Sequence, residues 1–119
     1  MTIDALLFNT LAPLVAGDAA YPDQVPEGTA APYIVHQQVG GLGLMWTEGT
    51  LPENESVRVQ VACWAATRDD ATDLAKAAEV AMLAQAGWQA EPLGGRTSTY
   101  DPATGLRGAR QDFMIWVPR

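Results

Sequence analysis

Two side chains in this sequence have the chemistry of a nucleophile and its general base. Cys63 is the single cysteine of the chain and His36 is its single histidine, and a thiol activated by an imidazole is a common catalytic pair. However, Cys63 lies on the apolar side of an alternating segment, where a free cysteine usually packs as a small hydrophobic residue. His36 falls within a predicted strand, where we expect a structural or interface histidine. The sequence therefore predicts a protein that is not an enzyme.

Three aspartates are close enough in sequence to suggest a metal site. Asp69, Asp70 and Asp73 stand at the start of a predicted helix, where carboxylates stabilise the positive end of the helix dipole without any metal. The glycine pairs at 40–41 and 94–95 do not precede a capped helix with the spacing of a phosphate-binding loop. We therefore expect no metal ion and no cofactor.

The charged residues are unevenly distributed along the chain. The 119 residues carry a formal net charge of −7, yet residues 1–57 contain seven carboxylates and no Lys or Arg. Residues 58–119 contain seven acids and seven bases. Because nucleic-acid binding needs a basic surface, this composition argues against it. The sequence has no apolar run long enough to span a membrane and no signal-peptide pattern, so we expect a cytosolic product.

Apolar spacing predicts two helices. The first covers residues 3–15, with leucines at helical spacing on one side. The second follows Thr67, which forms a capping-box pattern with Asp70, and Gly87 is expected to end it in the left-handed conformation. We expect this second helix to bury an alanine-rich stripe made of Leu74, Ala77, Ala78, Ala81 and Gln85.

Alternating residues predict about four strands. The clearest covers residues 57–64, and further strands are expected at 33–39, at 111–117 and within 88–110, ahead of a hairpin loop. Residues 17–32 are rich in turn formers and predict an extended connector. The residues of the clearest strand that we expect to face the core are Val57, Val59, Val61 and Cys63.

Together these elements predict a single domain, residues 1–119, of the α+β class. We expect an antiparallel or mixed sheet of about four strands with two helices packed on one face. Trp64 and Trp116 both lie opposite the core side of their strands, so we expect them to be neighbours on the outer face. Aromatic side chains exposed in this way indicate a surface for a partner.

Several segments, taken in order, match a known pattern. They are the opening amphipathic helix, Tyr21-Pro22, the strand entry 32–35, the strand 57–67 that leads into an alanine-rich helix, and Tyr100-Asp101 with the closing strand 111–116. In this order and spacing they resemble the tail-completion proteins of long-tailed bacteriophages, also called tail terminators or tail-to-head joining proteins. Ala62 departs from the pattern, because many such proteins have a polar residue there.

The resemblance implies a structural virion protein without catalytic residues or cofactors. Such proteins form a homohexameric ring that caps the tail tube, stops its polymerisation and offers a joining surface to the head. The partners implied are copies of the same chain, the tail tube protein and the head-tail connector protein. DNA would pass through the lumen without specific binding, and no membrane is involved. The implied location is the virion tail, with assembly in the host cytoplasm.

A ring needs two different, complementary surfaces on each subunit, and the charge distribution offers one pair. We expect the acidic first half to meet the arginines near the end of the chain, Arg96, Arg107, Arg110 and Arg119, across the subunit boundary; the alternative is a solvated surface of scattered charges. Acids of residues 1–57 are also expected to line the channel and repel DNA phosphates.

The segment 40–56 is long for a loop in a compact domain. It carries apolar residues, of which Leu42, Leu44 and Trp46 also suit a short strand. We expect the segment to contact a neighbouring subunit or the end of the tube, and the alternative is that it folds back on its own core. The full set of candidate interface residues is Leu44, Met45, Trp46, Trp64, Trp116, Arg96, Arg107 and Arg110.

Two other functions remain open at this point. One is a small oligomeric α+β ligand-binding or regulatory domain, which would show a formed pocket with converging polar groups. The other is a different phage head-tail connector or tube component, because these proteins share small α+β architectures.

Overall fold

The structure is a computed structural model that describes residues 2–43, 45, 47 and 49–119. Its elements follow the chain in this order: α1 (Ile3–Leu11), the short 3-10 turns η1 (Ala12–Leu14) and η2 (Ala16–Asp18), β1 (Ala20–Pro22), β2 (Tyr33–Gln38), β3 (Asn54–Ala65), α2 (Arg68–Ala84), β4 (Gln89–Asp101) and β5 (Leu106–Pro118).

The strands form one sheet in the order β1-β2-β3-β5-β4. All neighbouring strands pair antiparallel except β1 and β2, which are parallel, so the predicted α+β class with a mixed sheet is confirmed. The sheet has five strands where about four were expected. The additional strand, β1, lies inside the predicted connector 17–32. Its three residues end at Pro22, and so short a segment carries no alternating pattern that sequence could reveal.

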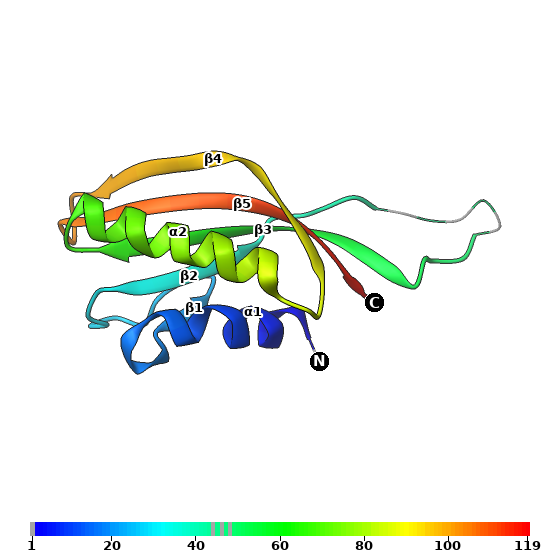
Figure 1. The fold of residues 1–119 in the computed structure, drawn as a ribbon, viewed down its shortest axis with the longest axis horizontal. Coiled ribbons are helices and arrows are strands. Elements are labelled where there is room, and N and C mark those ends of the chain that lie inside the picture. The colour runs from blue at the N-terminus through cyan, green and yellow to red at the C-terminus, as the bar shows by residue number, and fades with distance from the viewer. Residues whose placement is uncertain (1, 44, 46, 48) are drawn as a thin grey trace.

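The core lies between one face of the sheet and the helices. α2 packs across β3, β4 and β5, and α1 packs against α2 and β1 (Figure 1), so both helices cover the same face, as predicted. The predicted inward-facing residues of β3 are all buried, and so are those of β5. In order along the two strands they are Val57, Val59, Val61, Cys63, Phe113, Ile115 and Val117.

The start of α2 is as predicted, but its buried stripe is not. Thr67 Oγ1 accepts a hydrogen bond from the Asp70 backbone N–H at 3.2 Å, which satisfies one donor at the helix start. Ala77 is exposed and Val80 is 69% exposed, whereas Leu74 and Ala81 are half-buried. Alanines occur on several sides of this helix, so their positions in the sequence did not fix its rotation. The buried residues are Ala71, Ala75, Ala78 and Met82.

The end of α2 also differs from the prediction. The helix ends at Ala84, and Gln85 is already extended, with φ −64° and ψ 122°. The Gln85 side-chain oxygen accepts a hydrogen bond from the Gly87 backbone N–H at 2.9 Å. Gly87 is not among the glycines with positive φ, so a side-chain contact, and not a left-handed glycine, ends this helix.

β4 and β5 form a longer hairpin than the sequence predicted. The predicted hairpin loop is present: an Asp101 carboxylate oxygen accepts from the Ala103 backbone N–H at 3.0 Å, and the other accepts from the Thr104 hydroxyl. β5 begins at Leu106 and not at 111. The residues that follow Leu106, 107–110, are small or charged and show no apolar alternation, and they are in a strand because they pair with β4.

Residues 39–53, here called the arm, leave the sheet between β2 and β3. The Val39 backbone N–H donates to the Arg58 carbonyl at 2.7 Å, and the Arg58 N–H donates to the Gly40 carbonyl at 2.8 Å. Beyond this pair the arm projects from one end of the sheet (Figure 1), and the molecule measures 52 × 25 × 25 Å. The described residues of the predicted short strand, including Leu42, are not in a strand, while Leu44 and Trp46 lie outside the described residues.

Candidate assembly surfaces

The face of the sheet opposite the helices is open and hollowed. A depression of about 370 Å³ lies over β2, β3 and the start of β5. A second depression, of about 230 Å³, continues along β4 and β5. Gln60 and Arg110 line both depressions, so the two lie next to each other; together they are here called the sheet groove. Its floor is apolar near Val35, Ala62 and Trp64.

Trp64 is placed in the groove by close packing on the neighbouring strand. It pairs in register with Gly108 of β5, and a Cβ atom at Gly108 would meet Trp64 ring atoms at 2.9 and 3.0 Å and the Thr99 hydroxyl at 2.9 Å. Only glycine leaves room for the indole to lie over this strand. The sequence indicated that Trp64 faces outward, and the structure adds that it forms part of the groove floor.

Trp64 and Trp116 share the outer face, but they are not neighbours. Trp64 pairs with Gly108, near the start of β5, whereas Trp116 pairs with Ser56, near the start of β3. The strands are antiparallel, so a residue near the end of β3 faces the beginning of β5. The two positions are eight residue steps apart along β3, about 26 Å at the rise of an extended strand. Trp116 therefore belongs to the arm end of the sheet and not to the groove.

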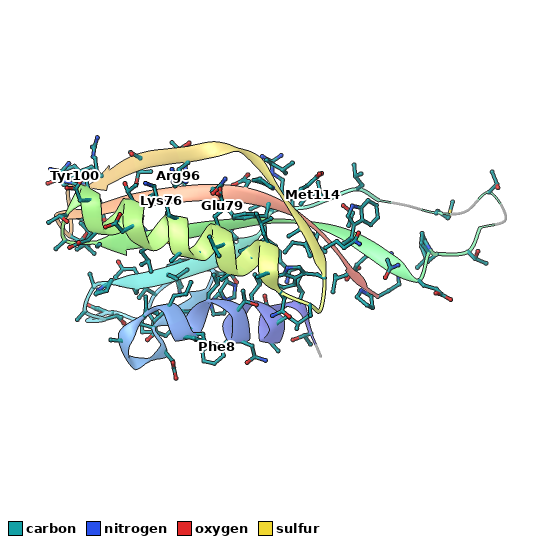
Figure 2. The ribbon with its side chains drawn as sticks, in the orientation of Figure 1. Phe8, Lys76, Glu79, Arg96, Tyr100 and Met114 are labelled. Carbon is teal, nitrogen blue, oxygen red and sulfur yellow. The ribbon has the colours of Figure 1, made fainter. Side chains whose placement is uncertain are left out.

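The four arginines of the proposed charge pairing have different surroundings. Arg119 contacts Glu55 of its own chain at 3.6 Å, and the Arg107 guanidinium lies 4.1 Å from the Tyr100 ring centroid. Arg96, labelled on β4 in Figure 2, and Arg110, in the sheet groove, are exposed. Within the described chain neither of these two has an ion-pair partner. They are the arginines available to another molecule.

The groove contains one ion pair of its own. Arg58 donates from Nε and Nη2 to the same Asp112 carboxylate oxygen, at 2.9 and 2.7 Å. The pair is partly exposed, and such surface pairs add little stability. The ion pair neutralises the charge of Arg58. Among the described groove residues, Arg110 is then the cation without an ion-pair partner.

His36 and Cys63 do not form a catalytic pair. His36 is 1% exposed, and neither ring nitrogen has a hydrogen-bond partner among the described residues. Burial lowers the pKa of His36, against a smaller opposite effect of Asp4 and Asp23. Burial raises the pKa of the Cys63 thiol from 9.0 to about 12. Both shifts favour neutral groups, the opposite of a thiolate–imidazolium pair.

The three aspartates that suggested a metal site do not form one in the described part of the chain. No group of three or more His, Cys, Asp or Glu side chains there is arranged to hold a metal ion. Asp69, Asp70 and Asp73 lie along the start of α2, as the capping argument predicted. Among the described residues, no helix is both long and apolar enough to cross a membrane.

The arm exposes apolar side chains. Leu42 is 57% exposed, Met45 is 68% exposed and Leu51 is 58% exposed. For these residues the alternative in which the segment folds back on its own core is wrong. Leu44 and Trp46, also expected at an interface, lie outside the described residues. Exposed apolar groups gathered on a projecting segment are typical of a surface that another protein covers.

The sequence model of a family described as Tail completion protein gp17 matches residues 5–118. The chain belongs to this family. The gp17 family consists of structural proteins of bacteriophage virions, so the resemblance noted from the sequence is confirmed, and tail components are the partners that this family implies. No individually curated protein matches the sequence.

Proposed function

We propose that this tail completion protein acts as a ring, of six copies, that caps the finished tail tube. The ring stops further polymerisation and presents a joining surface to the head-tail connector protein. DNA passes through its lumen without specific binding. Assembly takes place in the host cytoplasm before the ring becomes part of the virion tail.

One observation carries this proposal beyond the family assignment. The subunit exposes two unlike surfaces, an arm with apolar side chains and an open, hollowed sheet face. A ring is held by contacts between two different surfaces of each subunit, whereas a two-fold dimer uses the same surface twice. The pair of unlike surfaces therefore favours head-to-tail association over a symmetric dimer.

The charge of the first half supports the proposal that DNA passes without binding. Asp4, Asp18, Asp23 and Glu27 are exposed, and residues 1–57 contain no Lys or Arg. Carboxylates on a channel wall repel phosphates. A map of the assembled ring in which arginines dominate the inner wall would contradict this part of the proposal.

The mass of the purified protein tests the ring. Size-exclusion chromatography with light scattering should give a mass of about six subunits, either for the protein alone or after addition of tail tubes. A stable dimer would instead support the ligand-binding or regulatory alternative.

Particles from a phage that lacks the gene test the function directly. Electron microscopy should show overlong tails, or tails that fail to join heads, because nothing would end tube growth or complete the joining surface. Normal virions without this protein would contradict the proposal.

A further inference from the structure

The larger depression of the sheet groove carries more acid than base. Asp23 and Asp101 line it, and Arg110 is the one cation among its described lining residues. Arg110 also lines the second depression, so it stands where the two meet. The Asp101 oxygens accept hydrogen bonds within the hairpin loop, whereas the exposed Asp23 carboxylate has no partner among the described residues. Asp23 therefore supplies an uncompensated negative charge, which favours a cation at this position.

A buried hydroxyl without a partner lines the same depression. Tyr33 is 6% exposed, and its hydroxyl makes no hydrogen bond within the described chain. Burial and the Asp101 carboxylate raise the pKa of Tyr33, so the hydroxyl lies within the electrostatic reach of another group that lines the depression. A buried hydroxyl without a partner is unfavourable. A hydrogen-bond donor that enters the depression would supply the missing bond.

An arginine has the chemistry that these two groups call for. Its guanidinium is a cation, and its several N–H donors lie in one plane, so it can pair with a carboxylate and donate to a hydroxyl at the same time. The ligand predicted for the depression is therefore an arginine side chain of another molecule.

One arginine of this chain is free to act as that ligand. Of the arginines outside the depression, Arg58, Arg107 and Arg119 contact groups of their own chain. Arg68 is the first residue of α2, on the helix side of the sheet. Arg96 is exposed on β4 and has no ion-pair partner within the described chain. Arg96 is therefore the arginine that a second copy can receive.

The free edge of β4 presents this arginine at a bulge. β4 pairs only with β5 and ends the sheet on that side, and its register shifts between Leu93 and Thr97, just after Pro92. Proline and bulges hinder the pairing of an edge with a further strand, and a bulge redirects the side chains within it. The edge thus offers a neighbour the Arg96 side chain and not a row of backbone groups.

Arg96 and Asp23 lie on opposite sides of the sheet at the same level along its strands. The Asp23 backbone N–H donates to the His36 carbonyl at 2.9 Å, next to β1. His36 pairs with Val61, Val61 pairs with Gln111, and the bulge of β4 lies opposite Gln111. Copies placed edge to edge, with the β4 side of one against the β1 side of the next (Figure 1), therefore bring Arg96 to the level of Asp23.

We infer that Arg96 of one copy binds in the larger depression of the adjacent copy, where it pairs with Asp23 and donates a hydrogen bond to the Tyr33 hydroxyl. The two edges of the sheet are different, so the contact is head-to-tail and repeats around a ring. This inference rests on the proposed ring and names a contact that holds it together.

A double-mutant cycle tests the pairing of Arg96 with Asp23. Asp23→Asn and Arg96→Gln should each weaken association about tenfold in sedimentation velocity, and the double variant should be little weaker than either, because both remove the same contact. Asn suits the positive φ of 66° at position 23. The matched controls, with no expected effect, are Asp18→Asn, at another exposed aspartate with positive φ, and Arg68→Gln.

The Tyr33 hydroxyl gives a second measurement. Tyr33→Phe should leave the urea midpoint of the unassociated protein unchanged, because the hydroxyl has no partner there, and should weaken association about threefold to tenfold. Tyr100→Phe is the control, since Tyr100 is 49% exposed and does not line the depression. A lowered midpoint with unchanged association would show a structural hydroxyl and overturn its role in binding.

The outcomes separate this inference from the proposed function. Rings that tolerate both Asp23→Asn and Arg96→Gln overturn the contact and leave the ring standing. A double variant weakened by the product of the two single effects also overturns it, because the two side chains would then act at separate places. Failure of the wild-type protein to associate, even on tail tubes, overturns both proposals.

Discussion

At the scale of single residues, His36 is the unusual group of this fold. It is an almost fully buried histidine without a hydrogen-bond partner in the described chain. Burying an unpaired polar ring is unfavourable, and protonating it there is more so. The residue that resembled a catalytic base in the sequence is therefore a source of pH sensitivity.

The lowered pKa of His36 predicts a loss of stability in mild acid. The unfolded chain binds a proton below the usual pKa of 6.5 while the folded protein stays neutral, so the free energy of unfolding should fall as the pH drops below 6.5. One group contributes a slope of at most about 1.4 kcal/mol per pH unit. Urea unfolding from pH 7 to 5 measures it, and His36→Leu should remove this component. Equal pH slopes for the variant and the wild type would contradict it.

The raised pKa of Cys63 predicts an inert thiol. A shift from 9.0 to about 12 lowers the thiolate fraction about 1000-fold at a given pH, and burial blocks access as well. A colorimetric thiol reagent at pH 8 should leave the folded protein unmodified and should react fully in denaturant. Thr97→Cys provides an exposed control thiol. Rapid modification of the folded wild type would show that Cys63 is accessible.

At the scale of elements, the base of the arm depends on one glycine. Gly41 has φ 144°, and a Cβ atom there would overlap the Ser56 carbonyl oxygen. Gly41→Ala should therefore destabilise the protein by about 1–3 kcal/mol in urea unfolding followed by tryptophan fluorescence. Gly43→Ala is the matched control, because a Cβ at Gly43 meets nothing within 4 Å. Equal unfolding midpoints for the two variants would contradict this description of the arm base.

At the scale of the whole molecule, the net charge opposes association. Six copies, each with a charge of −7, together carry −42, so favourable contacts must exceed a general repulsion. Of the four arginines proposed to face the acidic half, Arg119 and Arg107 have partners within their own chain. Arg96 and Arg110 remain for pairing between subunits.

The response of the ring to salt measures the balance between these two effects. If pairing by Arg96 and Arg110 dominates, raising the salt from about 0.05 to about 0.5 M should dissociate the ring, because exposed pairs are screened. Arg110→Gln should reduce this sensitivity, and Arg107→Gln should change it less. Assembly that is indifferent to salt would eliminate charge pairing, and assembly strengthened by salt would show that repulsion dominates.

The sequence determined those features that depend on local patterns. Alternation identified the inward residues of β3 and β5, and the Thr67 cap marked the start of α2, because period and capping are properties of neighbouring residues. The ordered segments also identified the family, which the match over residues 5–118 confirms.

The tertiary structure decided what depends on pairing between distant segments. Strand register separates Trp64 from Trp116, although their sequence patterns look alike. Parallel pairing with β2 makes β1 a strand, and contact with the sheet fixes which side of the alanine-rich α2 is buried. The groove exists because β2, β3, β4 and β5 bring residues from four parts of the chain to one face, and no local pattern encodes that arrangement.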